Sequence, residues 1–238
     1  MKRQDNRAFD ELRPVRIVPD YIIFPEGSIL ISMGDTKVIC NVTVESGIPH
    51  WIKASGKPGG WITAEYSLLP RSTHTRSNRE FGGFSGRTQE VRRLIGRSLR
   101  AGFNLEKLEE YTCIVDCDVI QADGGTRTAS ITGGYIALCT ALNKMVEEGK
   151  MSADVFLEPI AAISVGVVNG TPMLDLNYQE DSIADVDMNL VMNRSGEYVE
   201  IQGSSEKAPF SRESMEILLD YGEKGIEKLF KIQERYLK

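Results

Sequence analysis

One junction between a strand pattern and a helix pattern limits how this chain can fold. The run YTCIVDCDVIQAD, which starts at Tyr111, predicts a strand that buries one side, formed by Cys113, Val115, Cys117 and Val119. From Thr128 the apolar spacing changes to that of a helix, which we expect to stop near Gly149. Because the strand pattern ends at Asp123, a strand end must lie beside a helix N-terminus.

The residues at this junction, QADGGTRT, have the chemistry of an anion-binding site. Gly124 and Gly125 allow close approach of the backbone, and unpaired N–H groups point outward at the positive end of the helix. Thr126 or Thr128 adds a hydroxyl donor, and Arg127 adds charge with two parallel donors. The alternative is a plain glycine turn with a threonine cap. The stretch matches neither a Walker A loop nor GxGxxG, so an ATPase or a dinucleotide site is not predicted.

Two hairpins are predicted, one in each half of the chain. In GSILISMGDTKVICNVTVE, β-branched runs flank Gly34-Asp35, which is a hairpin signal. The second turn is Asn169-Gly170, which suits type I′. After it, Leu174, Leu176 and Tyr178 alternate with polar residues, so we expect the returning strand to include all three.

Two further helices complete the predicted fold. Residues 88–103 have the apolar spacing of an amphipathic helix, with Arg93, Arg97 and Arg100 as a stripe on another face. A last helix begins near Ser211, a favourable N-cap residue. Each half therefore combines a hairpin with a long helix. We predict an α/β fold (α+β, two-layer) in which one domain, 1–238, consists of two related β-rich halves that meet near residue 150.

Positive charge is concentrated in one segment of an acidic chain. The net charge is −6, which by itself argues against nucleic-acid binding, but residues 71–100 carry +6 and contain no lysine. Arginine favours bidentate phosphate recognition, so the segment predicts contact with an RNA or DNA backbone. The alternatives are a solvated helix face and, for Arg92 or Arg93, ion pairs within or between chains. The arginines are Arg71, Arg76, Arg79, Arg87, Arg92, Arg93, Arg97 and Arg100.

Acidic side chains gather in LDLNYQEDSIADVDMNLV, which contains Asp175, Glu180, Asp181, Asp185 and Asp187. Clustered carboxylates bind hard cations such as Mg²⁺, which typically uses one or two carboxylates together with substrate phosphate. Exposed loop acids without a ligand are the alternative. With the arginine-rich helix and the anion cradle, these acids complete the parts of a phosphoryl-transfer site.

The cysteines, histidines, tryptophans and apolar runs are less informative about function. The four cysteines show no CxxC spacing, and His50 and His74 are too few for a zinc site, so we expect reduced core cysteines. Trp51 and Trp61 can stack a base, although an isolated Trp more often belongs to a core or an interface. No apolar run approaches the roughly 18 residues of a membrane span, and the start lacks a signal-peptide pattern. We therefore expect a cytoplasmic protein with no membrane partner.

Six blocks of the chain follow one another in a fixed order: GDTKVICNV, AEYSLLPRSTHTR, GRTQEVRRLIGRSLRA, DCDVIQADGGTRTASITGG, LDLNYQEDSIADVDMN and EIQGSSEKAPF. This order resembles that of the bacterial ribonuclease PH family, the phosphorolytic tRNA nucleotidyltransferases, over essentially the whole chain. More distantly, it is similar to the catalytic subunit of archaeal exosomes and to the domains of polynucleotide phosphorylase. The resemblance implies a fold of the ribosomal-protein-S5 domain 2-like type and a homohexamer built as a trimer of dimers.

The resemblance also implies roles for individual residues. Inorganic phosphate, the co-substrate and nucleophile, would be bound by Arg87, Gly125, Thr126 and Arg127. Asp181 and Asp187 would be the active-site carboxylates, which either hold Mg²⁺ or, through one of them, donate a proton to the leaving 3′-oxygen. RNA contacts are expected from Arg71, Arg76 and Arg79, which lie in the loop RSTHTRSNREFGGFSG, and from Arg93 and Arg97.

The implied activity is that of a phosphate-dependent 3′-to-5′ exoribonuclease. It would trim the 3′ ends of tRNA precursors or ribosomal RNA, release nucleoside 5′-diphosphates, and run in reverse from nucleoside diphosphates. One alternative is a ring subunit that binds RNA without activity, but none of the family's site residues is missing here. A second is an exosome-type subunit that needs a partner chain. A third is a hydrolytic nuclease, which does not require an arginine-lined phosphate cradle.

Overall fold

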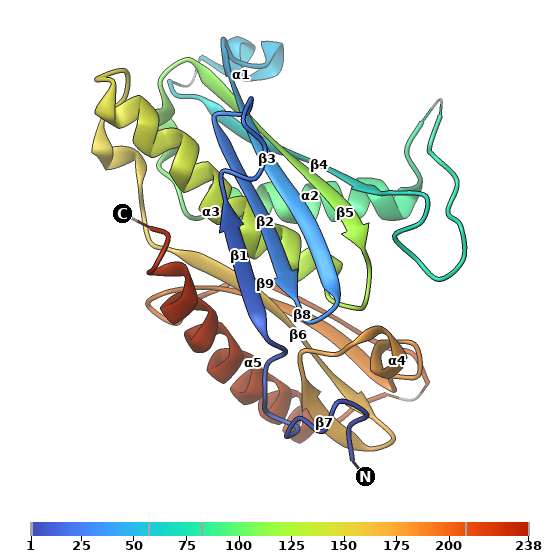
Figure 1. Ribbon diagram of the computed structural model, residues 1–238. Coiled ribbons are helices and arrows are strands. Elements are labelled where there is room, and N and C mark those ends of the chain that lie inside the picture. The colour runs from blue at the N-terminus through green and yellow to red at the C-terminus, as the bar shows by residue number, and fades with distance from the viewer. Residues whose placement is uncertain (1, 57, 82, 208, 238) are drawn as a thin grey trace.

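The computed structural model describes residues 2–56, 58–81, 83–207 and 209–237, which form two β-sheets and the helices that pack on them (Figure 1). The strands are β1 (Val15–Pro19), β2 (Gly27–Met33), β3 (Thr36–Ser46), β4 (Trp61–Leu68), β5 (Tyr111–Gln121), β6 (Ile160–Val168), β7 (Thr171–Leu174), β8 (Val186–Asn193) and β9 (Tyr198–Ser205). The helices are α1 (His50–Ser55), α2 (Gly86–Arg100), α3 (Thr126–Glu147), α4 (Tyr178–Asp181) and α5 (Arg212–Gln233).

The two sheets differ in how their strands are connected. The first sheet has the order β1-β2-β3-β5-β4, and β4 runs parallel to β5 while the other pairs are antiparallel. The parallel pair arises because the chain returns from β4 through α2 before it enters β5, which is a crossover connection. The second sheet, β7-β6-β8-β9, is antiparallel throughout. The mixed α/β prediction is therefore confirmed.

Both predicted hairpins form, but one strand is shorter than expected. Asn169 and Gly170 have φ angles of 49° and 74°, the left-handed conformation that a type I′ turn requires at both central positions. The alternation through Tyr178 wrongly extended the returning strand, because β7 ends at Leu174. Asp175 adopts a left-handed φ of 53°, and its buried carboxylate accepts a hydrogen bond from the backbone N–H of Arg13.

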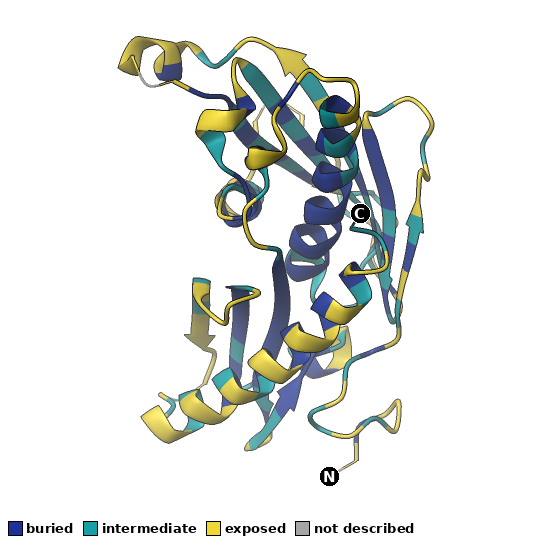
Figure 2. Ribbon diagram, turned by 90° about the vertical axis from the view of Figure 1, so that its left-hand side faces the viewer, coloured by how far each residue is buried: buried dark blue, intermediate teal, exposed yellow. Residues whose placement is uncertain are grey.

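Helix α3 occupies the centre of the molecule. It packs on β2 and β3 of the first sheet and on β6 of the second, and it is buried along most of its length (Figure 2). Helix α2 covers β4, and α5 covers β6 and β7. The predicted N-cap of α5 is confirmed, since the Ser211 hydroxyl accepts from the N–H of Ser214. One continuous core includes buried side chains from both sheets.

The environment of the cysteines and the apolar character of the helices can be compared with the sequence predictions. The four cysteines are buried free thiols, as predicted. Burial raises the pKa of the Cys113 thiol to about 12, which keeps it protonated and unreactive at neutral pH. Within the described residues, no helix combines the length and the apolar character needed to cross a membrane.

Candidate active site

The predicted anion cradle lies where β5 meets α3. Gly124 and Gly125 have φ angles of 74° and 64°, a conformation that glycine adopts without strain. Gly125 is the N-cap residue of α3, and no side chain caps the first N–H groups of the helix, which leaves them for a ligand. A Cβ on Gly124 would lie 2.4 Å from the carbonyl oxygen of Leu176. The turn therefore needs glycine both for its backbone conformation and for its packing.

The polar side chains around the cradle have distinct partners. The Thr126 hydroxyl lies 2.8 Å from the Tyr66 hydroxyl on β4, whereas the buried Thr128 hydroxyl donates to the Gly125 carbonyl at 2.9 Å. Because the Thr128 hydroxyl is fully buried whereas Thr126 is only half-buried, Thr126 is the better candidate for ligand binding. Arg127 donates through Nη1 to Oε1 of Gln202 on β9 at 3.1 Å, which holds the guanidinium beside the second sheet.

Two half-buried carboxylates share an electrostatic environment with Arg127 and Arg87. Asp181 is the last residue of α4, and Asp187 is the second residue of β8. Burial, and next the charge of Asp181, raise the pKa of Asp187 to about 6, while Arg127 acts in the opposite direction. Burial also raises the pKa of Asp181, against the charges of Arg127 and Arg87. The fold thus brings the predicted phosphate-binding arginines and the predicted carboxylates into one site.

The other acids of the predicted cluster are committed to ion pairs elsewhere. Three of the five carboxylates have a basic partner, which leaves the pair Asp181 and Asp187 for a ligand. Within the described part of the chain, no group of three or more His, Cys, Asp or Glu side chains could hold a metal ion. The five-acid cluster is therefore reduced to a pair. The three ion pairs, each 2.7 Å long, are Asp175 with Arg13, Glu180 with Arg3, and Asp185 with Lys207.

An N-terminal clamp of Arg3 and Arg13 supports the site and was missed by sequence reasoning. The buried Arg13 guanidinium donates to the Asp123 carbonyl through Nη1 and to the Gly124 carbonyl at 3.4 Å through Nη2, so it holds the turn before α3. Arg3 donates through Nε to Glu180 at 2.8 Å and so fixes the residue before Asp181. The clamp joins the phosphate cradle to the carboxylate helix. The only sequence signal was a polar N-terminal segment rich in arginine.

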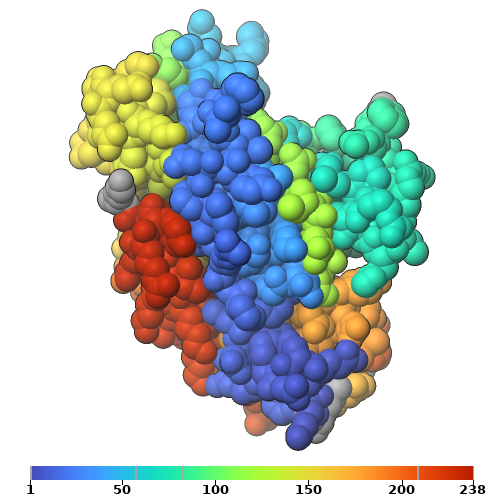
Figure 3. Space-filling view, viewed as in Figure 1, coloured from blue at the N-terminus to red at the C-terminus, as the bar shows by residue number. Residues whose placement is uncertain are grey.

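The loop between β4 and α2 holds three of the predicted RNA-contacting residues, the exposed Arg71, Arg76 and Arg79. It projects from the body of the molecule (Figure 3). Its base lies beside the cradle, because the N–H of Ala122 donates to the carbonyl of Ser72 at 2.8 Å. Farther along, the His74 ring is 5.2 Å from the Tyr178 ring of α4. The loop therefore begins next to the cradle and reaches the helix that carries Asp181.

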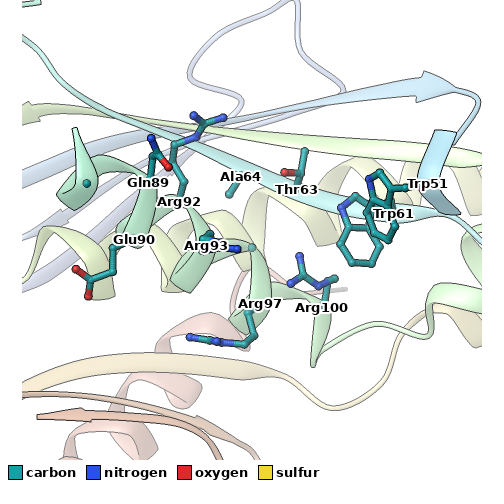
Figure 4. Close-up of a pocket in the computed structure, with 12 residues that line it drawn as sticks. Trp51, Trp61, Thr63, Ala64, Gln89, Glu90, Arg92, Arg93, Arg97 and Arg100 are labelled. Atoms are coloured by element: carbon teal, nitrogen blue, oxygen red, sulfur yellow. The ribbon is translucent and has the colours of Figure 1, made fainter. Parts of the chain in front are cut away.

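The arginines of α2 differ in whether they form ion pairs with carboxylates. Arg92 forms an ion pair with Glu65, as one predicted alternative allowed, and its guanidinium lies 4.0 Å from the centre of the Phe84 ring. Arg97 pairs with Glu200 at 2.8 Å, whereas Arg93 is exposed. Arg93 and Arg97 line a groove along α2 (Figure 4).

Comparison with known families gives matches along most of the chain. The model of the 3′ exoribonuclease family, domain 1, matches residues 11–142, and that of domain 2 matches residues 158–225. Among curated proteins, ribonuclease PH of Bacillus velezensis is 53% identical over 238 residues, with 99% of this chain and 96% of that protein covered.

Solved structures share the fold at lower identity. A chain of the Archaeoglobus fulgidus exosome with RNA bound to the active site has a TM-score of 0.82 and 24% identity, covering 97% of this chain and 92% of that one. Rice (Oryza sativa) Rrp46 has a TM-score of 0.79 and 19% identity, with 99% of each chain covered. These likenesses establish the fold.

Proposed function

Because the chain belongs to the 3′ exoribonuclease family, we propose that its cradle and carboxylate pair carry out phosphorolysis at RNA 3′ ends. The observation that carries the proposal is the uncapped N-terminus of α3, with Arg127 and Arg87, placed against Asp181 and Asp187. A hydrolytic nuclease activates water and needs no separate anion site for its nucleophile. A phosphorolytic enzyme needs one, because its nucleophile is an anion.

The residues of the cradle hold and orient inorganic phosphate. The N–H groups of the first turn of α3, the Thr126 hydroxyl, and the guanidinium groups of Arg127 and Arg87 donate to its oxygens. The held phosphate attacks the phosphorus of the last phosphodiester in line, the bond from that phosphorus to the 3′-oxygen of the preceding nucleotide breaks, and the last nucleotide is released as a nucleoside 5′-diphosphate. A phosphodiester is exchanged for a phosphoanhydride, so the reaction is reversible and nucleoside diphosphates extend RNA. The fixed cations stabilise the charge on the transferring group without reorganisation.

Asp181 and Asp187 fit a hard divalent cation such as Mg²⁺. Both are half-buried, and burial, and next the charge of Asp181, raise the pKa of Asp187, so a cation bound by the two carboxylates would relieve this repulsion. Two carboxylates are also what Mg²⁺ typically takes from a protein when substrate phosphate supplies further oxygens. Bound there, Mg²⁺ would supply charge neutralisation at the scissile phosphate. The raised pKa equally suits Asp187 to give a proton to the leaving 3′-oxygen.

We also propose which RNA is the substrate and which residues bind it. Arg71, Arg76 and Arg79 contact the phosphates of a flexible 3′ tail, since their loop begins beside the cradle. The tails of tRNA precursors, and of ribosomal RNA, are the proposed substrates. In a bacterium these precursors are met in the cytoplasm, which is the proposed location.

We further propose that the protein acts as a homohexamer, a trimer of dimers. In support, chains from an archaeal exosome core share its fold. Sedimentation should give about six times the 26.5 kDa mass of one chain, without a second polypeptide. A monomer active only with a partner chain would favour the exosome-type alternative. Within each chain we propose one domain, 1–238, of two related halves that meet near residue 150, supported by the core common to both sheets.

The activity is tested directly with 3′-labelled RNA and Mg²⁺, with and without inorganic phosphate, by identifying the released nucleotide. Release of nucleoside diphosphates that depends on phosphate is the expected result. Monophosphates released without phosphate would identify a hydrolase and overturn the assignment. Absence of any release would favour the inactive RNA-binding subunit.

A further inference from the structure

Two hydroxyl groups meet at the edge of the phosphate cradle. The Tyr66 hydroxyl, on β4, lies 2.8 Å from the hydroxyl of Thr126, which is the first residue of α3. The proposed phosphorolysis uses the Thr126 hydroxyl to bind phosphate, but it gives Tyr66 no part. A polar group that is 8% exposed and lies beside the site needs an explanation of its own.

The position of Tyr66 follows from the parallel pairing of β4 with β5. Tyr66 is opposite Cys117 of β5, and residues paired across a sheet point to the same face. That face lies under α3, because Sγ of Cys117 is 3.9 Å from the carbonyl oxygen of Ser130. The Tyr66 ring is therefore packed beneath the first turns of the helix, and the sheet fixes where its hydroxyl lies.

The two hydroxyls share more protons than they need for each other. Each hydroxyl has a single proton, and the hydrogen bond between them uses one of the two. In the part of the chain that the structure describes, the other proton has no protein acceptor, whichever hydroxyl donates to its neighbour. The pair therefore presents one free donor at the cradle, and its ligand must offer an acceptor oxygen.

The charges around the pair favour an anion as that acceptor. Burial raises the pKa of the Tyr66 phenol, whereas its hydrogen bond with Thr126, and next the charges of Arg87 and Arg127, act in the opposite direction. Because the net direction is upward, the phenol is protonated at neutral pH and is able to donate. Its hydroxyl lies in the field of the same two guanidinium groups that we propose to hold phosphate.

We propose that Tyr66 is a positioning residue of the phosphate site, whose hydroxyl donates to that of Thr126 and so directs the Thr126 proton to the bound phosphate. The inference rests on the proposed function and deepens it at the same site. The phenol is the stronger acid of the two hydroxyls, so it takes the donor role. A hydroxyl that accepts one hydrogen bond also donates the next one more strongly. Without the phenol, the Thr126 hydroxyl loses the partner that fixes its rotation.

The test begins with Tyr66→Phe, which keeps the buried ring and removes the hydroxyl. Titration calorimetry with inorganic phosphate should show the Kd of the variant raised by about three- to tenfold, the loss of one neutral hydrogen bond. The KM for phosphate should rise by the same factor, while the KM for RNA at saturating phosphate should not change. Tyr135→Phe is the matched control, because it removes a buried tyrosine hydroxyl farther along α3, and it should bind phosphate as the wild type does.

A double-mutant cycle tests whether Tyr66 acts through Thr126. In a Thr126→Val background, Tyr66→Phe should change the Kd for phosphate by less than about 1.5-fold, because the hydroxyl to be positioned is absent. Thr126→Ser keeps a hydroxyl and should preserve the full effect of Tyr66→Phe. The same fold-change in the valine background as in the wild type would overturn the proposal, since Tyr66 would then act independently of Thr126. So would an equal rise in the KM for RNA, which would indicate a general distortion of the site.

Because phosphate binding and phosphorolysis are measured separately, two failures can be told apart. If the wild type releases nucleoside diphosphates and Tyr66→Phe binds phosphate with an unchanged Kd, the role of Tyr66 is refuted and the proposed function stands. If the wild type binds phosphate but releases no nucleoside diphosphate, the proposed function fails, and the Kd values still decide the role of Tyr66. A wild type that binds no phosphate would overturn both.

Discussion

Replacement of Asp187 by Asn should stabilise the metal-free protein at neutral pH, although it removes a proposed catalytic carboxylate. Burial and the charge of Asp181 raise the pKa of Asp187 from 3.8 to about 6. A shift of about 2 pKa units corresponds to about 3 kcal/mol, at 1.36 kcal/mol per unit, and this is the cost of ionising the group in the folded state. For a chain of this size, the melting temperature should rise on the order of 5–10 °C.

The pH dependence gives the sign of the effect. Between about pH 4 and about pH 6, the folded state binds a proton at Asp187 more tightly than the unfolded state does. The wild type therefore loses stability as the pH rises through this window, and the Asn variant does not lose this contribution. The difference in melting temperature between variant and wild type should be small near pH 4 and complete above pH 6.

Thermal unfolding followed by circular dichroism, with a chelator present, measures this difference. Asp185→Asn is the control, because a hydrogen bond from Lys207 lowers the pKa of Asp185, so its replacement should not stabilise the protein. Added Mg²⁺ should then stabilise the wild type and leave the Asp187→Asn variant nearly unchanged. A variant that melts at or below the wild-type temperature at neutral pH would refute the electrostatic reasoning.

Three other substitutions test separate parts of the site. Arg127→Ala should raise the KM for phosphate by about 10- to 100-fold, because charge-assisted hydrogen bonds of about 1.5–3 kcal/mol are lost, and initial rates against phosphate concentration measure this. Arg76→Ala should weaken RNA binding uniformly across sequences and reduce the slope of log affinity against log salt by about 0.7, measured by fluorescence anisotropy. Arg13→Met should lower stability by about 3 kcal/mol in urea unfolding, since it leaves the buried Asp175 carboxylate with Arg7, at 3.7 Å, in place of its 2.7 Å partner. If adding Asp175→Asn recovers none of that loss, the pair is not its cause.

The parts of the fold that sequence predicted are those set by local interactions. The type I′ turn at Asn169-Gly170 follows from two residues that tolerate positive φ, and the start of α5 follows from the Ser211 cap. The cradle belongs to the same class, since a strand, two glycines and a helix are adjacent along the chain. Each of these features is determined by a few consecutive residues.

The parts that sequence did not predict depend on partners far along the chain. The strand pattern after Leu174 was interrupted because Asp175 turns inward to Arg13, which lies 162 residues earlier. Likewise, the sequence predicts one acidic cluster, but Arg3 forms an ion pair with Glu180 and Lys207 forms one with Asp185. Neither partner shares a periodicity or a motif with the acid that it binds. Such ion pairs become visible only when the fold brings distant segments together.

The N-terminal clamp has a consequence for how the protein is made. Arg3 and its partner Glu180 are 177 residues apart, so a chain emerging from the ribosome presents its N-terminal arginines long before their carboxylates exist. The cradle is synthesised earlier than the acidic half of the site, and the N-terminal clamp that joins the two can form only after Glu180 has been added. The complete site that we propose can therefore form only after Asp187 has been added to the chain.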